Sequence, residues 1–94
     1  MRIEGVIWYP ETIDKPIGKH GVFQEEAEDV RFGRPLYRKV KKGHVPGEDV
    51  YAALGQTEAG RYLIVFFIYK LTHEVLILSA RDMDNQERKQ YERR

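Results

Sequence analysis

The stretch VYAALGQTEAGRYLIVFFIYKLTHEVLILSAR, residues 50–81, decides the fold of this chain of 94 residues. It contains three apolar runs, at residues 50–54, 62–69 and 75–80, and two short polar breaks separate them. The middle run, YLIVFFIY, is β-branched and aromatic, and its eight residues are too few to span a membrane. An unbroken apolar run of this length is typical of a strand covered on both faces. We therefore predict that residues 62–69 form the central strand of a small sheet.

Both polar breaks have the length of a hairpin loop, so the three runs are expected to form adjacent antiparallel strands. Arg61 stands at the start of the central strand, and Arg81 stands at the end of the strand that follows. If these two strands pair as a hairpin, both arginine side chains arrive at the same end of the sheet.

The amino-acid composition limits the kinds of protein that this chain can be. A hydrophobic share of 41% is enough for one modest core, and a chain of this length makes one domain. The absence of cysteine excludes a disulfide framework, a thiolate metal site and a cysteine nucleophile. Neither a charged-then-apolar leader nor a membrane-spanning segment is recognisable, so we expect a cytoplasmic protein that does not enter the membrane.

Charge is balanced overall but polarised along the chain. Sixteen basic and fifteen acidic residues give a net charge of +1. Residues 24–29 (QEEAED) are acidic, whereas residues 34–44 (RPLYRKVKKGH) contain five Lys or Arg and no acid. A chain of this kind can carry a basic face opposite an acidic one.

The residues before the core strands show weaker patterns. Alternating residues over 1–8 predict a short first strand. A proline favours the start of a helix at residue 10, but a further proline and a glycine disrupt it, so we expect a broken or single-turn helix over 10–19. Apolar residues at helical spacing, with acids between them, predict an amphipathic helix over 23–32.

The remaining segments complete the expected architecture. Residues 36–42 alternate weakly and are very basic, which suits an edge strand. Asp84 and Glu87 have the spacing of a capping box before a short charged helix, whose expected contacts with the sheet are Met83 and Tyr91. We therefore expect the α+β class: a small antiparallel sheet of about four to five strands, two N-terminal helical segments and a short C-terminal helix.

Three blocks of the sequence together resemble the BrnT toxin family, whose fold is similar to that of the RelE-type ribonuclease toxins. Residues 8–22, WYPETIDKPIGKHGV, resemble the family's Trp-Asp-Pro…Lys-His-Gly-Val opening. Residues 55–65, GQTEAGRYLIV, match its Gly…Gly-Arg-x-Leu-x-Val hairpin, and residues 78–91, LSARDMDNQERKQY, match its Ile-Ser-Ala-Arg run with the following Glu-Arg and Tyr. The blocks occur in the right order and span nearly the whole chain, which implies a single BrnT-like domain over residues 1–94.

The resemblance implies the toxin of a type II toxin–antitoxin pair, an endoribonuclease that uses no metal or cofactor. It also implies a partner, a small DNA-binding antitoxin of the ribbon-helix-helix type. Four residues of the family's pattern are retained: Lys19, His20, Arg61 and Arg81. The family commonly has arginine at two positions where this chain has Val50 and Leu76.

RNA cleavage without a metal requires that the 2′-OH lose a proton, that the phosphorane be stabilised, and that the leaving oxygen gain a proton. Arginine suits the second task because its planar fork matches phosphate oxygens and stays charged. Arg61 and Arg81 are therefore candidates for a phosphate clamp. The structural alternative is that both arginines form ion pairs, with Glu58, Asp82 or Glu87 as available partners.

His20 and Tyr51 are the candidates for proton transfer. The pKa of histidine lies near 6.5, which suits an acid or a base. Alternatively, His20 caps the end of a helix. Tyr51 can supply a phenolic proton, and Tyr62, like Tyr51, can stack a splayed base; half-buried tyrosines on strands are otherwise part of the core. Lys19 accompanies His20 as a possible RNA contact.

The basic run of residues 34–44 is the remaining RNA-binding candidate, through Arg38, Lys39, Lys41 and Lys42. A solvated edge strand is the alternative. His44 and His73 are expected to be exposed in loops, and no residues have the spacing of a metal site.

A second functional class stays open: a non-catalytic module on the same scaffold that binds RNA or a protein. Val50 and Leu76 favour it, because the family commonly has basic residues there. An exposed sheet edge also allows a homodimer to form by strand pairing across a two-fold axis.

Overall fold

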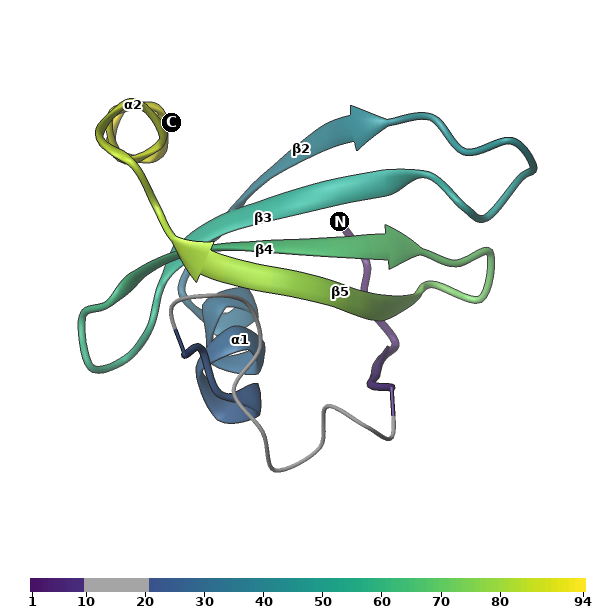
Figure 1. The fold of residues 1–94 in the computed structure, drawn as a ribbon, viewed down its shortest axis with the longest axis horizontal. Helices are drawn as coiled ribbons and strands as arrows, with labels where there is room; N and C mark the ends of the chain where they lie inside the picture. Colours follow the sequence, from purple (N-terminus) through teal and green to yellow (C-terminus); the bar gives the residue numbers. More distant parts are fainter. Residues whose placement is uncertain (10–20) are drawn as a thin grey trace.

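The chain forms one five-stranded sheet with helices on its two sides, in a computed structural model that describes residues 1–9 and 21–94 (Figure 1). In sequence order the elements are β1 (Gly5–Ile7), α1 (Gln24–Asp29), the 3₁₀ turn η2 (Val30–Phe32), β2 (Leu36–Lys41), β3 (Val50–Gln56), β4 (Tyr62–Tyr69), β5 (Glu74–Asp82) and α2 (Asn85–Glu92). The strands lie side by side in the order β1-β5-β4-β3-β2, so β4 is central, as predicted.

The hairpins predicted between the core strands are confirmed. β4 pairs antiparallel with β3 and with β5, and β3 pairs antiparallel with β2, which forms one edge as expected. The register between β4 and β5 shifts between Phe66 and Phe67, so that Phe66 lies opposite Ser79 and Phe67 opposite Ile77. Leu78 is thus the extra residue of a bulge in β5.

The prediction of an antiparallel sheet was wrong, because the sheet is mixed. β1 runs parallel to β5 and occupies the other edge, with Val6 opposite Val75 and Ile7 opposite Leu76. Hairpin loops dictate the direction of the strands that they join, whereas a strand attached through a long connection can lie in either direction. The sequence pattern of residues 1–8 therefore indicated a strand but carried no information on its direction.

The prediction of two N-terminal helical segments was also wrong. The chain begins with strand β1, and the described residues contain one α-helix before β2, the six-residue α1, which continues as the 3₁₀ turn η2. The broken helix expected over residues 10–19 lies outside the described residues. Gly33 follows η2 at a point where a Cβ atom would lie 2.7 Å from the main-chain oxygen of Gln56. This close approach to β3 leaves no room for a side chain, so residue 33 has to be glycine.

Helix α1 covers one face of the sheet (Figure 1). Ala27 and Val30 pack in one buried cluster with side chains from the central strands, namely Ala53, Leu63, Val65, Phe67, Val75, Ile77 and Ala80. These sheet residues alternate with others that point to the opposite face.

Helix α2 covers only one end of the opposite face (Figure 1). Tyr91 packs there with Ala52, Leu54 and Ile64, and it donates a hydrogen bond of 3.2 Å to the main-chain oxygen of Gly33. Met83 also packs against this cluster, so both predicted contacts of the C-terminal helix are confirmed.

Beyond α2, no described element covers this side of the sheet. We call the surface formed by Ile7, Val50, Phe66, Ile68 and Leu76 the open face; all five side chains are half-buried. Among residues 1–9 and 21–94, therefore, elements cover both faces of the central strand only along the first part of β4.

Candidate functional site

Arg81 lies at the end of β5, on the same side of the sheet as α2. Its Nη1 and Nη2 groups donate hydrogen bonds of 2.7 and 2.8 Å to the two carboxylate oxygens of Glu87. Nη1 also donates to the main-chain oxygen of Asp82 at 3.1 Å. The hydrogen bonds to Glu87, followed by its negative charge, raise the pKa of the Arg81 guanidinium.

One edge of the Arg81 guanidinium has no partner among the described residues. The Nη1 and Nη2 groups each donate one N–H to the Glu87 carboxylate. The Nε–H and the other N–H of Nη2 then point outward along one edge of the guanidinium plane. The side chain is 37% exposed, and its guanidinium carbon lies 5.6 Å from the centre of the Phe66 ring. This edge can donate two parallel hydrogen bonds to an anion.

Glu87 both caps α2 and orients Arg81. Its Oε1 atom accepts the main-chain N–H of Asp84 at 2.9 Å, while the Asp84 carboxylate accepts the N–H of Glu87 at 2.8 Å. The predicted capping box is therefore confirmed. Hydrogen bonds from Arg81 lower the pKa of the Glu87 carboxyl, and the positive charge of Arg38 adds a smaller effect in the same direction.

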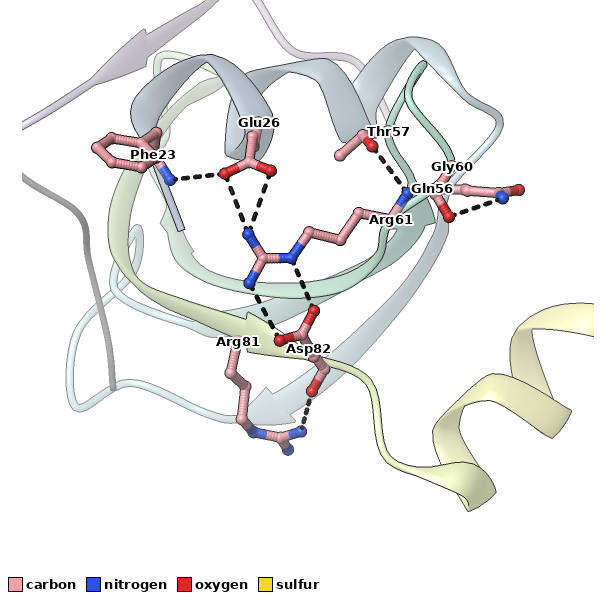
Figure 2. Close-up of polar contacts among 8 residues, drawn as sticks. All are labelled: Phe23, Glu26, Gln56, Thr57, Gly60, Arg61, Arg81 and Asp82. Carbon is pink, nitrogen blue, oxygen red and sulfur yellow. Dashed lines mark hydrogen bonds and ion pairs between the residues drawn. The ribbon is translucent and has the colours of Figure 1, made fainter. Parts of the chain in front are cut away.

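Arg61 precedes β4 and is held between two carboxylates (Figure 2). Its Nε and Nη2 donate to the Asp82 carboxylate at 2.8 and 3.1 Å, and Nη1 lies 3.1 and 3.2 Å from the oxygens of Glu26 in α1. Its main-chain N–H donates to Thr57 Oγ1 at 3.0 Å. The hydrogen bonds to Asp82 are the largest cause that raises the pKa of this guanidinium. Arg61 thus links α1 to β5.

The two arginines lie at the same end of the sheet but on opposite faces (Figure 2). Arg81 is paired with Ile64, which packs beneath α2, whereas Arg61 contacts Glu26 of α1 on the other side. They therefore do not meet as a clamp around one phosphate. The structural alternative expected from the sequence, ion pairs with Asp82 and Glu87, is what the structure contains.

The two candidate tyrosines also lie on opposite faces. Tyr51 is on the α1 side, where its ring stacks on Phe67 with centres 6.0 Å apart and meets Tyr69 edge-on at 5.9 Å. Tyr62 is on the α2 side, edge-on to Tyr91 at 6.0 Å, and the Arg88 guanidinium lies 4.0 Å from its ring centre. Tyr62 therefore shares a face with Arg81, and Tyr51 does not.

The basic residues of β2 are also divided between the two faces of the sheet. Arg38 lies opposite Ala52 on the α2 side and donates to Gln90 of α2 at 2.7 Å. Lys41 lies opposite Val50 and is exposed, as is Lys42. Lys39 instead binds Asp49 at 2.9 Å, and this contact raises the pKa of its ammonium group. A hydrogen bond from the Gly43 N–H, followed by that from Lys39, lowers the pKa of Asp49.

Lys19 and His20 lie outside the described residues. His73, expected to be exposed, is half-buried, and its Nδ1 atom is 2.6 Å from the hydroxyl of Tyr69, which in turn donates to the main-chain oxygen of Arg2. Because that hydroxyl has one proton, His73 is the donor in its bond to Tyr69. This contact fastens the β4–β5 turn to the N-terminus.

Glu26 and Gln90 are the site neighbours that sequence reasoning missed. In the sequence, Glu26 belongs to the acidic segment of residues 24–29, and Gln90 belongs to the charged C-terminal helix. Both bind arginines that are distant in sequence, Arg61 and Arg38. The sequence does show acidic and basic segments that could pair, but such a pattern does not identify which side chains contact each other.

Within the described residues, no group of three or more His, Cys, Asp or Glu side chains is arranged to hold a metal ion. In the same part of the chain, no helix has the length and apolar character that a membrane span requires.

Comparison with known proteins identifies the family. No match is found among curated proteins. Residues 8–87 match the family described as "Ribonuclease toxin, BrnT, of type II toxin-antitoxin system". The match covers most of the sequence, includes both Arg61 and Arg81, and confirms the resemblance seen in the three sequence blocks. The chain therefore belongs to the BrnT family of ribonuclease toxins from type II toxin–antitoxin systems.

Proposed function

We propose that this chain is an endoribonuclease that cleaves RNA without a metal, and that Arg81 stabilises the pentacoordinate phosphate. Family membership implies RNA as the substrate and an antitoxin as the partner. The observation that supports this role for Arg81 is the edge of its guanidinium that has no partner among the described residues. Glu87 holds the other edge with bonds of 2.7 and 2.8 Å, so the group is oriented before an anion binds.

The residues around Arg81 are suited to binding the phosphate backbone of RNA. Arg38 and Lys41 lie on the same side of the sheet, and Lys42 follows at its edge. Tyr62 lies on this side as well, with Arg88 above its ring. Cationic side chains provide salt-dependent affinity for the backbone of RNA, and an arginine or aromatic surface can stack a base.

Other roles in the proposal are assigned by chemistry. His20 transfers the protons, with Lys19 beside it as an RNA contact, since imidazole can act as base and acid near neutral pH. Tyr51 and Arg61, the two other candidates, contact the α1 side, and their observed contacts favour structural roles. Lys39 is bound to Asp49 and is the weakest of the RNA-binding candidates.

The partner in this proposal is a small antitoxin of the ribbon-helix-helix type, encoded beside the toxin, and both proteins act in the cytoplasm. The exposed edge of β2 also allows a homodimer, but four closely spaced basic residues there oppose pairing with an identical strand. A binding module without catalytic activity is the alternative function. It is favoured by Val50 and Leu76, which give the open face two aliphatic side chains where the family commonly has arginine.

The test is incubation of the purified protein with bulk RNA in the presence of a chelator. The wild type should fragment the RNA, and folded Arg81→Ala should lose at least about 100-fold in rate, the scale for one transition-state donor. Arg2→Ala is the matched control, because Arg2 is exposed at the other end of the chain and should leave the rate unchanged.

Two results would contradict the proposal. Cleavage by folded Arg81→Ala at the wild-type rate would remove Arg81 from the mechanism. Intact RNA with the wild type, both alone and with ribosomes, would leave the non-catalytic binding module.

A further inference from the structure

A row of aliphatic side chains crosses the open face of the sheet. The registers place Ile7 opposite Leu76, Leu76 opposite Ile68, and Ile68 opposite Val50. Since paired residues of neighbouring strands point to the same side, these four side chains form one continuous row over four strands. All four are half-buried, and no described element covers them.

The chemistry of this row fits a protein partner better than RNA. Bases are bound by aromatic rings or guanidinium planes, and the row contains neither. Phe66, the aromatic ring beside it, already has the Arg81 guanidinium at 5.6 Å. Branched aliphatic side chains instead pack well against the apolar side of a helix.

The dimensions of the row also fit a helix. Strands lie about 4.8 Å apart, so the three steps from Ile7 to Val50 span about 14 Å. An α-helix covers that distance in about ten residues, which is three turns. A partner helix can therefore place one apolar side chain per turn along the row.

The charged residues around the row indicate which charges the partner helix should carry. Lys41 lies at the end of the row beside Val50, and Arg38 and Arg81 lie on the side toward α2. Glu74 is on the other side, two residues before Leu76, and its carboxylate accepts a hydrogen bond of 2.9 Å from Thr72. The complementary helix thus has acidic residues along the flank that faces α2.

We propose that the open face is the docking site for an amphipathic helix of the antitoxin, with its apolar side on the Ile7–Val50 row and its acidic flank toward Arg38 and Arg81. A carboxylate on that flank takes the edge of Arg81 that has no partner among the described residues. Binding then covers the proposed catalytic arginine; this consequence, unlike the interface itself, rests on the proposed function.

The test uses the complex with the tagged product of the reading frame beside this gene. Leu76→Asp and Val50→Asp each place a negative charge beneath the docked helix, where it is buried and repelled by the acidic flank, and should weaken binding by at least about tenfold. Phe23→Arg is the matched control, since Phe23 is a 50% exposed apolar residue at the start of α1, on the other side of the sheet. It should leave the affinity unchanged. Circular dichroism establishes that each variant is folded.

A crosslinking experiment avoids any dependence on the folding of the charged variants. A benzophenone amino acid replaces Ile68 in one sample and Phe23 in another, and each complex is irradiated. Position 68 should crosslink to the antitoxin, and position 23 should not. Crosslinks only to RNA or only to a second copy of the chain, unchanged affinity of folded Leu76→Asp, or no complex with the wild type would each overturn the proposal.

Cleavage assays with the free toxin keep the two proposals separate. If the wild type cuts no RNA but position 68 crosslinks to the antitoxin, the interface stands and the catalytic proposal fails. If the wild type cuts RNA but the antitoxin binds folded Leu76→Asp normally, the interface fails and the catalytic proposal stands.

Discussion

Arg61 and Arg81 are joined through Asp82, although their guanidinium groups lie on opposite faces of the sheet (Figure 2). The Asp82 carboxylate accepts hydrogen bonds of 2.8 and 3.1 Å from Arg61, and its main-chain oxygen accepts one of 3.1 Å from Arg81. Arg61 is enclosed by two carboxylates, whereas Arg81 has one edge without a partner among the described residues. The two arginines of the family's pattern are therefore expected to have separable roles.

Arg61→Ala should reduce stability more than catalysis. The substitution leaves Glu26 and Asp82 without their shared cation, and it removes the link between α1 and β5. Because Asp82 is 46% exposed, solvent screens part of the loss, and we expect a decrease of about 1 kcal/mol in the free energy of unfolding. Urea denaturation measures this change, and RNA cleavage per folded molecule should stay near the wild-type value.

Arg61→Ala with Glu26→Gln and Asp82→Asn tests the reason for that loss. Neutral amides need no cation, so the triple variant should recover part of the lost stability. A single variant that is as stable as the wild type but unable to cleave RNA would assign Arg61 to catalysis instead.

The hairpins were predictable because apolar runs and loop lengths determine neighbouring strands locally. The position of β4 at the centre and of β2 at the edge followed from the same patterns. The parallel pairing of β1 with β5 was not predictable, because it depends on a contact between Val6 and Val75 at opposite ends of the chain. Sequence periodicity describes a strand but not the direction in which it joins a distant one.

Gly55 offers a test of the packing between β3 and the segment that follows α1. A Cβ atom at this position would lie 2.6 Å from Val30 Cγ1 and 3.2 Å from its main-chain oxygen. Gly55→Ala should therefore destabilise the protein by about 1–3 kcal/mol, as overpacking in a core does. Gly5→Ala is the control: its Cβ would meet only Glu74 at 3.7 Å, so a change within about 0.5 kcal/mol is expected. Thermal denaturation compares the two, and equal stability would contradict the packing argument.

The faces on which the site residues lie could not be read from the sequence. Leu76 and Arg81 are five positions apart, so strict alternation puts them on opposite faces of a strand. The bulge in β5 at Leu78 changes that parity, and both side chains lie on the α2 side. No residue in this run signals a bulge as a glycine would. The sequence therefore identified the end of the sheet at which the arginines lie, but not their faces.

Glu87 should make the stability of the protein depend on pH in the acidic range. Its folded-state pKa is lowered, mainly by hydrogen bonds from Arg81. The stabilisation is therefore fully present above the unfolded-state pKa of about 4.3, and it is lost as the pH falls through the folded-state value. Glu87→Gln keeps an oxygen for the Asp84 N–H but loses the charge, so it should cost about 1 kcal/mol at pH 7.

The same variant supplies the control for the pH dependence. Since protonated Glu87 and glutamine are both neutral, the difference in the free energy of unfolding between the wild type and Glu87→Gln should be smaller at about pH 3 than at pH 7. Urea denaturation at pH 7 and at pH 3 tests this. A constant difference between the two proteins at both pH values would show that the charge of Glu87 does not stabilise the fold.

The basic end of β2 should govern the salt dependence of RNA binding. Lys41 and Lys42 are exposed, on the edge strand that also carries Arg38. Each lysine that neutralises a phosphate releases counterions, at about 0.7 in the slope of log affinity against log salt for a single strand. Lys41→Ala with Lys42→Ala should therefore lower this slope by about 1.4. Three proteins are compared, each carrying Arg81→Ala so that the RNA is not cleaved: Arg81→Ala alone, with Lys41→Ala and Lys42→Ala, and with Arg2→Ala. The affinity of each for RNA is measured at several salt concentrations. Arg2→Ala should keep the slope of Arg81→Ala alone, because Arg2 pairs with Glu4 at the N-terminus. An unchanged slope in the double variant would mean that RNA does not follow this edge. The role of the basic residues would then be to prevent the edge strand from pairing with other strands.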